Sequence, residues 1–316
     1  MKCRFCGNEL THEFINLFNA PTSNSFLSRE QLDEPEVFFP LKLFVCSSCF
    51  LVQIDEYKKS EDIFNNEYAY FSSFSTTWLE HSKKYSEKMI DRFKLSQNSL
   101  VIEIASNDGY LLQYFNERKI PCLGIEPTKN TAKKAKEKGL DVIEEFFCSK
   151  LAKKFVEKNK KADLLIGNNV LAHVPDINDF VEGLKIVLKD NGIISMEFPH
   201  VMQLIENNQF DTIYHEHFSY FSLLTVKMIF EKHDLEIFDV DELPTHGGSL
   251  RIYAQHKKEG ICKKNEGLEK VIAKEKLFGM DSIHYYQGFQ AKAEKIKISF
   301  LDFLIKAKQN EKKVMA

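Results

Sequence analysis

The segment YHEHFSYFS at residues 214–222 concentrates side chains that can move protons. A histidine supplies a general base with a pKa near neutral pH, and a nearby carboxylate orients its ring. In an extended segment alternate side chains share a face, so we expect Tyr214 and Glu216 on one side and His215 and His217 on the other. The segment predicts acid–base chemistry, with a metal site or a surface histidine cluster as alternatives.

Two further motifs carry candidate residues for the same site. NNVLAHVPD contains His173 shortly after an apolar run, which predicts a histidine facing the cleft at the end of a sheet. A histidine that caps a helix or is simply buried is the alternative. THGGSLRIY, residues 245–253, has two glycines before a strand, which indicates either close backbone approach or a plain hairpin turn.

Four of the seven cysteines form two CxxC pairs, Cys3 with Cys6 and Cys46 with Cys49. Two such pairs can complete a tetrahedral zinc site, and four protein ligands leave no position open for water. We therefore expect a structural zinc ion. Unrelated free cysteines are the alternative; a redox motif is disfavoured because neither pair follows a strand and opens a helix.

From residue 99 short apolar runs alternate with amphipathic segments. The runs cover 99–105, 122–127, 141–146, 163–169 and 192–198, and helix candidates lie between them, one of them at 179–190. This alternation predicts an α/β fold with a parallel, doubly wound, Rossmann-like sheet. After it we expect a helix at 223–233, strands at 235–240 and 250–255, and helical structure from about residue 264.

The turn after the first of these strands predicts a cofactor site. In such sheets ligands bind beyond the carboxyl ends of the strands. Glu103 suits the ammonium of an amino acid moiety, Glu126 suits ribose hydroxyls, and no GxGxxG motif indicates a dinucleotide. We expect S-adenosylmethionine (SAM), with another ligand of a generic Rossmann-like protein as the alternative. The expected SAM-binding residues are Glu103, Ala105, Asn107, Asp108, Gly109, Glu126, Asn168 and Asn169.

Composition excludes several classes of partner. The net charge of -3 and the lysines scattered among glutamates predict neither nucleic-acid nor membrane binding. No apolar run reaches the roughly 20 residues needed to span a bilayer. The N-terminus MKCRFCGNEL lacks the apolar part of a secretion signal, so we expect a cytoplasmic protein, monomeric or homodimeric.

In the same order, the two CxxC pairs, EIASNDGYLL, NNVLAHVPD, YHEHFSYFS and HGGSLR resemble the zinc-domain-bearing, SAM-dependent sugar C-methyltransferases. The resemblance implies methyl transfer to C3 of a nucleotide-linked 4-keto-6-deoxysugar through a base-generated enolate. It implies that His217 is the base and that Tyr214, Glu216 and His173 are its partners. One tyrosine of YAYFSS also matches an active-site position, and we favour Tyr68 over Tyr70.

The expected domains are a zinc-binding domain at 1–65, a SAM domain at 66–255 and a mostly helical C-terminal segment at 256–316. Members of the family usually continue into a Gly-rich α/β part, so we expect this last domain to be incomplete. Two other functions stay open: an O- or N-methyltransferase for another small molecule, and a non-catalytic zinc-ribbon interaction protein with a degenerate methyltransferase fold.

Overall fold

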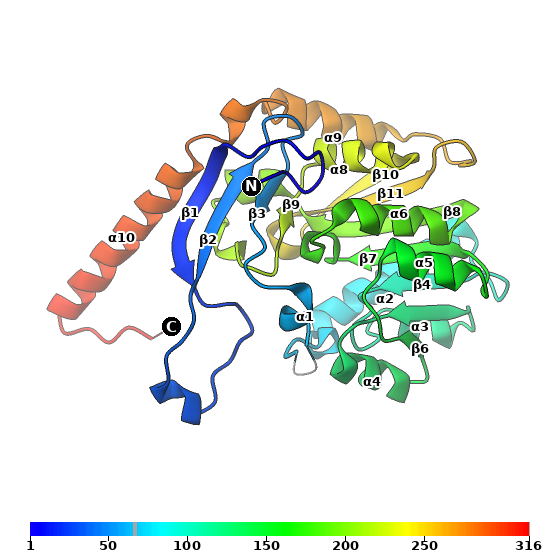
Figure 1. The fold of residues 1–316 in the computed structure, drawn as a ribbon, viewed down its shortest axis with the longest axis horizontal. Coiled ribbons are helices and arrows are strands. Elements are labelled where there is room, and N and C mark those ends of the chain that lie inside the picture. Colours follow the sequence, from blue (N-terminus) through cyan, green and yellow to red (C-terminus); the bar gives the residue numbers. More distant parts are fainter. Residues whose placement is uncertain (66–67, 316) are drawn as a thin grey trace.

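A mixed seven-stranded sheet forms the centre of the computed structural model, which describes residues 1–65 and 68–315 (Figure 1). Its strand order is β10-β11-β8-β7-β4-β5-β6. The strands β4 to β8 are parallel, whereas β11 pairs antiparallel with β8 and β10 antiparallel with β11. Their bounds are β4 Val101–Ile104, β5 Cys122–Ile125, β6 Asp141–Ile143, β7 Ala162–Asn168, β8 Leu188–Pro199, β10 Leu235–Leu243 and β11 Ser249–His256.

Helices cover both faces of this sheet, as the alternating pattern predicted. One core cluster joins the sheet to α5, α6, α8 and α9, and another joins the opposite face to α2 and α3. Successive strand residues take opposite sides, so Leu165 belongs to the first cluster and Leu164 and Ile166 to the second. The helices are α2 Thr76–Phe93, α3 Leu112–Glu117, α4 Lys129–Glu137, α5 Ser149–Val156, α6 Ile177–Val187, α8 Leu223–Lys232 and α9 Glu266–Leu277.

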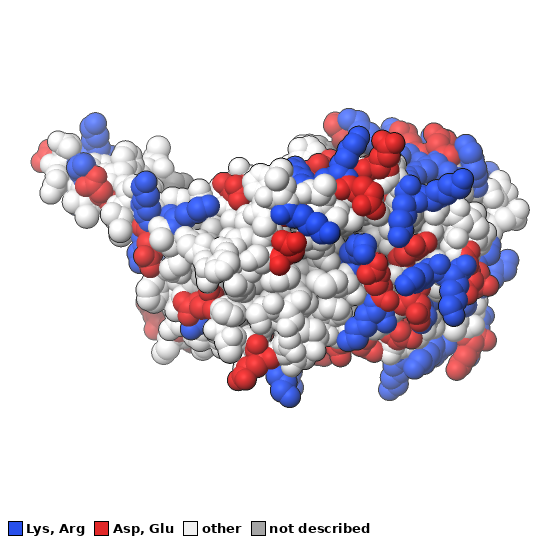
Figure 2. Space-filling model, turned by 90° about the horizontal axis from the view of Figure 1, so that it is seen from above, with Lys and Arg blue, Asp and Glu red and all other residues white. Residues whose placement is uncertain are grey.

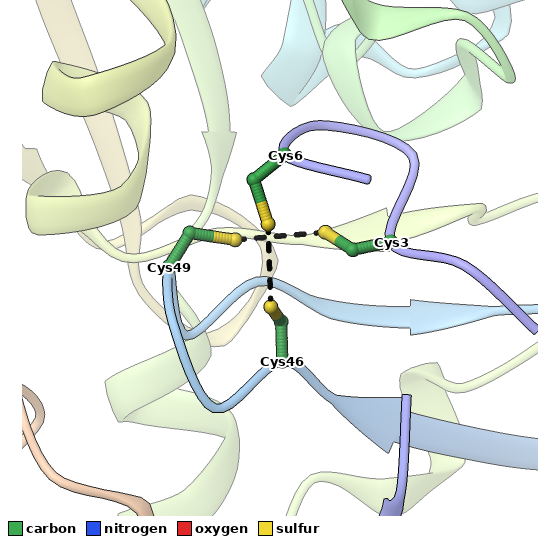
Figure 3. A group of neighbouring side chains, drawn as sticks. All are labelled: Cys3, Cys6, Cys46 and Cys49. Carbon is green, nitrogen blue, oxygen red and sulfur yellow. Dashed lines mark hydrogen bonds between the residues drawn. The ribbon is translucent and has the colours of Figure 1, made fainter. Parts of the chain in front are cut away.

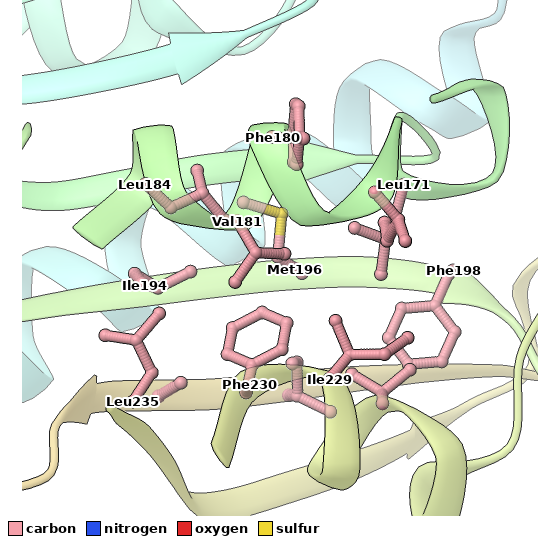
Figure 4. Packing of buried hydrophobic residues seen from close by; sticks show 14 of the residues in the cluster. Leu171, Phe180, Val181, Leu184, Ile194, Met196, Phe198, Ile229, Phe230 and Leu235 are labelled. Carbon is pink, nitrogen blue, oxygen red and sulfur yellow. The ribbon is translucent and has the colours of Figure 1, made fainter. Parts of the chain in front are cut away.

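Figure 4 shows the first cluster, in which α6 and α8 pack against β8. Phe180 and Leu184 of α6 and Phe230 of α8 are at most 2% exposed. The helix predicted at 179–190 ends earlier than expected, because Leu188 already pairs with Ala162 in the sheet.

A second sheet has four antiparallel strands in the order β1-β2-β3-β9. The first three, β1 His12–Ala20, β2 Phe39–Val45 and β3 Val52–Ile54, come from the N-terminal part of the chain. The fourth, β9 Ser219–Tyr220, follows the histidine-rich segment, and its residues pair with Val52 and Gln53. The N-terminal sheet is therefore completed by a strand far away in the sequence.

The C-terminal helix α10, Phe289–Gln309, begins against β1, where the rings of Phe14 and Phe289 stack at 5.0 Å, and then runs away from the rest of the molecule (Figures 1 and 2). Charged side chains of both signs are interspersed on the broad end opposite this helix (Figure 2).

In the described ranges, no helix is long and apolar enough to cross a membrane. The remaining helices are the short α1 Ser60–Ile63 and α7 Val201–Glu206.

Candidate active site

A cavity of about 540 Å³ lies beyond the carboxyl ends of β4, β5 and β7. Parallel strands leave such a crevice where the chain crosses from one side of the first strand to the other, and β4 lies between β5 and β7. Ile104, Ile125 and Asn168 form its floor, and residues of the N-terminal part, among them Asn24 and Glu56, also line it. The cavity therefore combines the predicted cofactor side with a wall from the N-terminal domain.

The turn after β4 takes its shape from three residues with positive φ: Ala105 (55°), Asn107 (49°) and Gly109 (75°). Ala105 and Asn107 line the cavity. Gly109 instead faces α4, where an added Cβ would collide with the side chain of Leu140. Asp108 is also outside the wall and binds Ser73. Close packing against Leu140 and Ala135 thus accounts for the glycine, and the part of Asp108 and Gly109 in SAM binding stays a prediction.

Asn107 and Glu126 connect this turn to its surroundings. The Asn107 amide N–H donates to Glu126 Oε2 at 2.8 Å, and its side-chain oxygen accepts from the N–H of Ser72 at 2.9 Å. The other carboxylate oxygen of Glu126 accepts from the N–H of Thr128 at 2.9 Å. Burial raises the pKa of Glu126, and these donors oppose the rise. Glu126 lines the cavity where the ribose was expected.

Glu103 lies fully buried beneath the cavity wall rather than in it. Within the described ranges neither of its oxygens makes a hydrogen bond of good geometry, and burial raises its pKa well above the ordinary 4.5. The phenol of Tyr110, which lines the cavity, neighbours this carboxylate. Buried polar groups need partners, so an unpaired carboxylate beside a cavity fits a cationic ligand.

Asn168 and Asn169 also line the cavity, and both contribute buried side-chain atoms without a partner in the described part of the chain. The amide of Asn168 offers both a donor and an acceptor, and Asn169 offers an acceptor. The methionine part of SAM carries an ammonium and a carboxylate, which these groups and Glu103 would satisfy. The residues therefore fit SAM.

The histidine-rich segment is a turn and not an extended strand, because the N–H of His217 donates to the carbonyl of Tyr214 at 3.1 Å. The turn changes which side chains share a side of the segment. Tyr214, Glu216 and His217 all line the cavity, whereas His215 does not. The His215 Nε2 instead lies 3.2 Å from the carbonyl oxygen of Pro40.

His217 is held on two sides. The Tyr214 hydroxyl lies 2.7 Å from its Nε2, and the carbonyl of Thr212 bonds to the ring as well. Burial, with the neighbouring His173, lowers the pKa of His217 well below the ordinary 6.5, so its neutral form predominates. A neutral ring carries one proton, and the Tyr214 hydroxyl can donate to Nε2 where this proton sits on the other nitrogen, which a carbonyl acceptor such as that of Thr212 favours.

Of the residues predicted to assist His217, His173 lies beside its ring, whereas the carboxylate of Glu216 contacts other side chains. His173 Nδ1 lies 2.9 Å from the backbone oxygen of Glu216, and its ring centroid is 4.7 Å from that of His217. Burial lowers the pKa of His173 to about 4. The Glu216 carboxylate interacts with Tyr68, Ser23 and Asn24 rather than with the ring of His217. Tyr68 and the half-exposed Tyr70 both line the cavity.

The HGGSLR motif contributes His246 to the cavity wall, although the sequence pattern drew attention to its two glycines. Gly247 and Gly248 pack against Gln209 and Gln203, so the close approach at these glycines is to the protein itself. His246 lines the cavity with φ 51°, and its ring meets Trp78 edge-on at 5.3 Å. Sequence reasoning missed Trp78 and Asn24 as cavity residues because they lie in segments without a chemical motif, and it did not single out Tyr110 within EIASNDGYLL.

The four cysteines of the CxxC pairs converge at the N-terminal domain (Figure 3). Their sulfur atoms all lie within 4.8 Å of one another, with Cys3 Sγ 3.6 Å from Cys49 Sγ and Cys6 Sγ 3.5 Å from Cys46 Sγ. Tetrahedral zinc with Zn–S bonds of about 2.3 Å separates its sulfur atoms by about 3.8 Å. The four thiols therefore fit a structural zinc ion.

Comparison with known proteins identifies the domains of the chain. A family model described as a methyltransferase domain matches residues 78–240, more than half of the chain. A zinc binding domain model matches residues 3–64, and a C-methyltransferase C-terminal domain model matches residues 244–316. The C-methyltransferase NovU of Streptomyces niveus is 29% identical over 296 residues, which are 94% of this chain and 70% of that protein.

Two solved structures are similar to part of the chain at low identity. The magnesium protoporphyrin IX methyltransferase ChlM of Synechocystis PCC 6803 with bound SAH gives a TM-score of 0.45 at 13% identity, over 56% of this chain and 82% of that one. The PH0226 protein of Pyrococcus horikoshii gives 0.49 at 14% identity, over 64% and 100%. No conclusion on the substrate follows from likeness at this level.

The fold, the cavity and the cysteine cluster together define a methyltransferase with a zinc-binding domain, and the chain belongs to the methyltransferase-domain family. It is a SAM-dependent C-methyltransferase, and its predicted cofactor SAM and structural zinc are confirmed.

Proposed function

We propose that the enzyme methylates C3 of a nucleotide-linked 4-keto-6-deoxysugar through an enolate. The observation that carries this proposal is the pairing of Tyr214 with a neutral His217 in the wall of the cavity that fits SAM. Methyl transfer to carbon requires a carbon nucleophile, which is made by removing a proton beside a ketone. The resemblance of the motifs to the sugar C-methyltransferases supports the choice of acceptor.

His217 takes the C3 proton in this proposal. Its low pKa keeps the ring neutral at neutral pH, and in the tautomer in which the Tyr214 hydroxyl donates to Nε2 this nitrogen has a free lone pair. In the free enzyme the Tyr214 hydroxyl lies within hydrogen-bond distance of Nε2. When the acceptor enters, this hydroxyl turns to the C4 oxygen, which frees Nε2 for the proton and places a donor on the developing enolate.

His173 supports this step by holding the turn. Its Nδ1 faces a backbone carbonyl and therefore carries the proton, so the ring orients Glu216 and packs against His217. The residues that fit SAM are Glu103 beneath the wall and Asn107, Glu126, Asn168 and Asn169 in it. SAM supplies the methyl group, and the enzyme mainly positions it against the carbon nucleophile.

A screen of nucleotide-linked 4-keto sugars with SAM, read by mass spectrometry, tests the proposal. We expect the wild type to replace one hydrogen at C3 by a methyl group and His217→Asn to lose this activity. His215→Asn is the matched control, because the neighbouring His215 points to Pro40 and leaves the cavity untouched. A methyl group on oxygen or nitrogen, or full activity of His217→Asn, would contradict the carbon mechanism.

A further inference from the structure

The loop between β1 and β2, residues 21–38, reaches the turn that carries the proposed base. Ser23 Oγ and Asn24 Nδ2 both donate to Glu216 Oε1, each at 2.9 Å. Asn24 lines the cavity and has a positive φ of 57°, a conformation that asparagine tolerates better than most residues. The zinc domain thus places two hydrogen-bond donors on a buried carboxylate of the site.

The start of strand β2, which follows this loop, also contacts this turn. The carbonyl of Pro40 lies 3.2 Å from His215 Nε2, and the ring of Phe39 meets that of His215 edge-on at 6.1 Å. Between these two contacts the loop exposes large apolar side chains such as Phe26, which is 80% accessible. The turn therefore contacts the loop through Glu216 and the start of β2 through His215.

Glu216 needs these donors. Its side chain is buried, and burial raises the pKa of its carboxyl group, whereas Asn24, Ser23 and Tyr68 lower it again. A buried carboxylate stays charged only where hydrogen bonds replace its water. Since both loop donors bind Oε1, neither occupies the second oxygen of this carboxylate, which lines the cavity together with Tyr68.

We propose that Ser23 and Asn24 are positioning residues of the methyltransferase, which hold Glu216 so that its free oxygen accepts a hydroxyl of the acceptor. The zinc domain then contributes to acceptor binding as well as to stability. This inference rests on the proposed function for the identity of the acceptor. The contact of the loop with Glu216 does not depend on it.

Kinetics of Asn24→Ala and Ser23→Ala test the positioning role. A hydrogen bond to a charged group contributes roughly tenfold, so each variant should raise KM for the acceptor about tenfold and leave the dissociation constant of SAM unchanged. The acid limb of the pH profile should move to higher pH, and Ser23→Thr should restore activity. Thr22→Ala is the matched control, since Thr22 bonds Ser25 in the same loop and not Glu216.

A double-mutant cycle with Glu216→Ala and cleavage by trypsin complete the test. Asn24→Ala should add little in the Glu216→Ala background. Arg29 is the single tryptic site of residues 21–38, so Asn24→Ala and Glu216→Ala should both speed cleavage there, without any substrate present. Fully additive effects, or cleavage no faster than in Thr22→Ala, would overturn the inference. A wild type that methylates no 4-keto sugar would refute the proposed function, while the cleavage result would still decide the loop contact.

Discussion

Replacing Glu103 by glutamine should stabilise the SAM-free enzyme and weaken SAM binding. The carboxylate is fully buried without a well-formed hydrogen bond in the described part of the chain, and burial raises its pKa well above the ordinary 4.5. Folding therefore favours the protonated acid. Glutamine has nearly the same shape and avoids a buried charge.

The magnitude follows from proton linkage. Between pH 4.5 and the folded pKa of Glu103, the unfolded chain has lost this proton and the folded chain keeps it. The free energy of unfolding then falls by about 1.4 kcal/mol per pH unit as pH rises, and levels off above the folded pKa. Glu103→Gln lacks this decline, so the difference between variant and wild type should grow with pH.

Denaturant unfolding across about pH 4.5 to 8 measures this difference. Glu117→Gln, at an exposed position of α3, is the matched control and should give no pH-dependent difference. Calorimetry in buffers of different ionisation enthalpy should also show that SAM binding releases a proton in the wild type and not in Glu103→Gln. A pH-independent difference in stability together with no proton release would refute the assignment of Glu103 to the ammonium of SAM.

Three further predictions concern the zinc site, the buried ion pair and the base. Cys46→Ser should release zinc and lower the melting temperature, whereas His217→Ala should keep both, as metal analysis and thermal unfolding would show; loss of metal in His217→Ala would point to a catalytic metal. Arg251→Ala should destabilise the fold by about 3–5 kcal/mol because the buried carboxylate of Glu197 loses its arginine and keeps only His81 and Thr245 as partners. Burial alone would raise the pKa of Glu197, but His81 and Arg251 lower it to about 2. The destabilisation by Arg251→Ala should therefore shrink as pH falls from 4.5 towards 2. A destabilisation that stays constant with pH in denaturant unfolding would contradict the pairing. The acid limb of kcat, measured with the acceptor saturating, should lie well below pH 6.5, since burial lowers the pKa of His217; a kcat limb at 6.5 would exclude it as the base.

Local patterns predicted the sheet and the zinc ligands. Buried parallel strands are continuous apolar runs, and the two ligands of a CxxC pair are close neighbours in the chain. Both patterns therefore lie within short stretches of sequence. The same reasoning identified Tyr214, His217 and His173 as candidates that the fold brings into one cavity wall.

What the sequence could not predict depends on contacts between distant segments. The bond between Tyr214 and the N–H of His217 makes a turn where alternation suggested an extended strand. Asn24 reaches Glu216 across 192 positions, and β9 joins the N-terminal sheet through long-range pairing. The spacing of residue types within a short stretch of sequence carries no information on such contacts. The contribution of the zinc domain to the cavity is therefore seen only in the folded chain.

Solvent exchange at C3 of the acceptor tests the central claim most directly. A nucleotide-linked 4-keto-6-deoxysugar is incubated with the enzyme and S-adenosylhomocysteine in heavy water, so that no methyl transfer occurs. We expect deuterium to enter C3 with the wild type and with His215→Asn, and not with His217→Asn. Methyl transfer to C3 in the presence of SAM that proceeds equally well without His217, or a wild type that catalyses no exchange, would contradict the enolate mechanism.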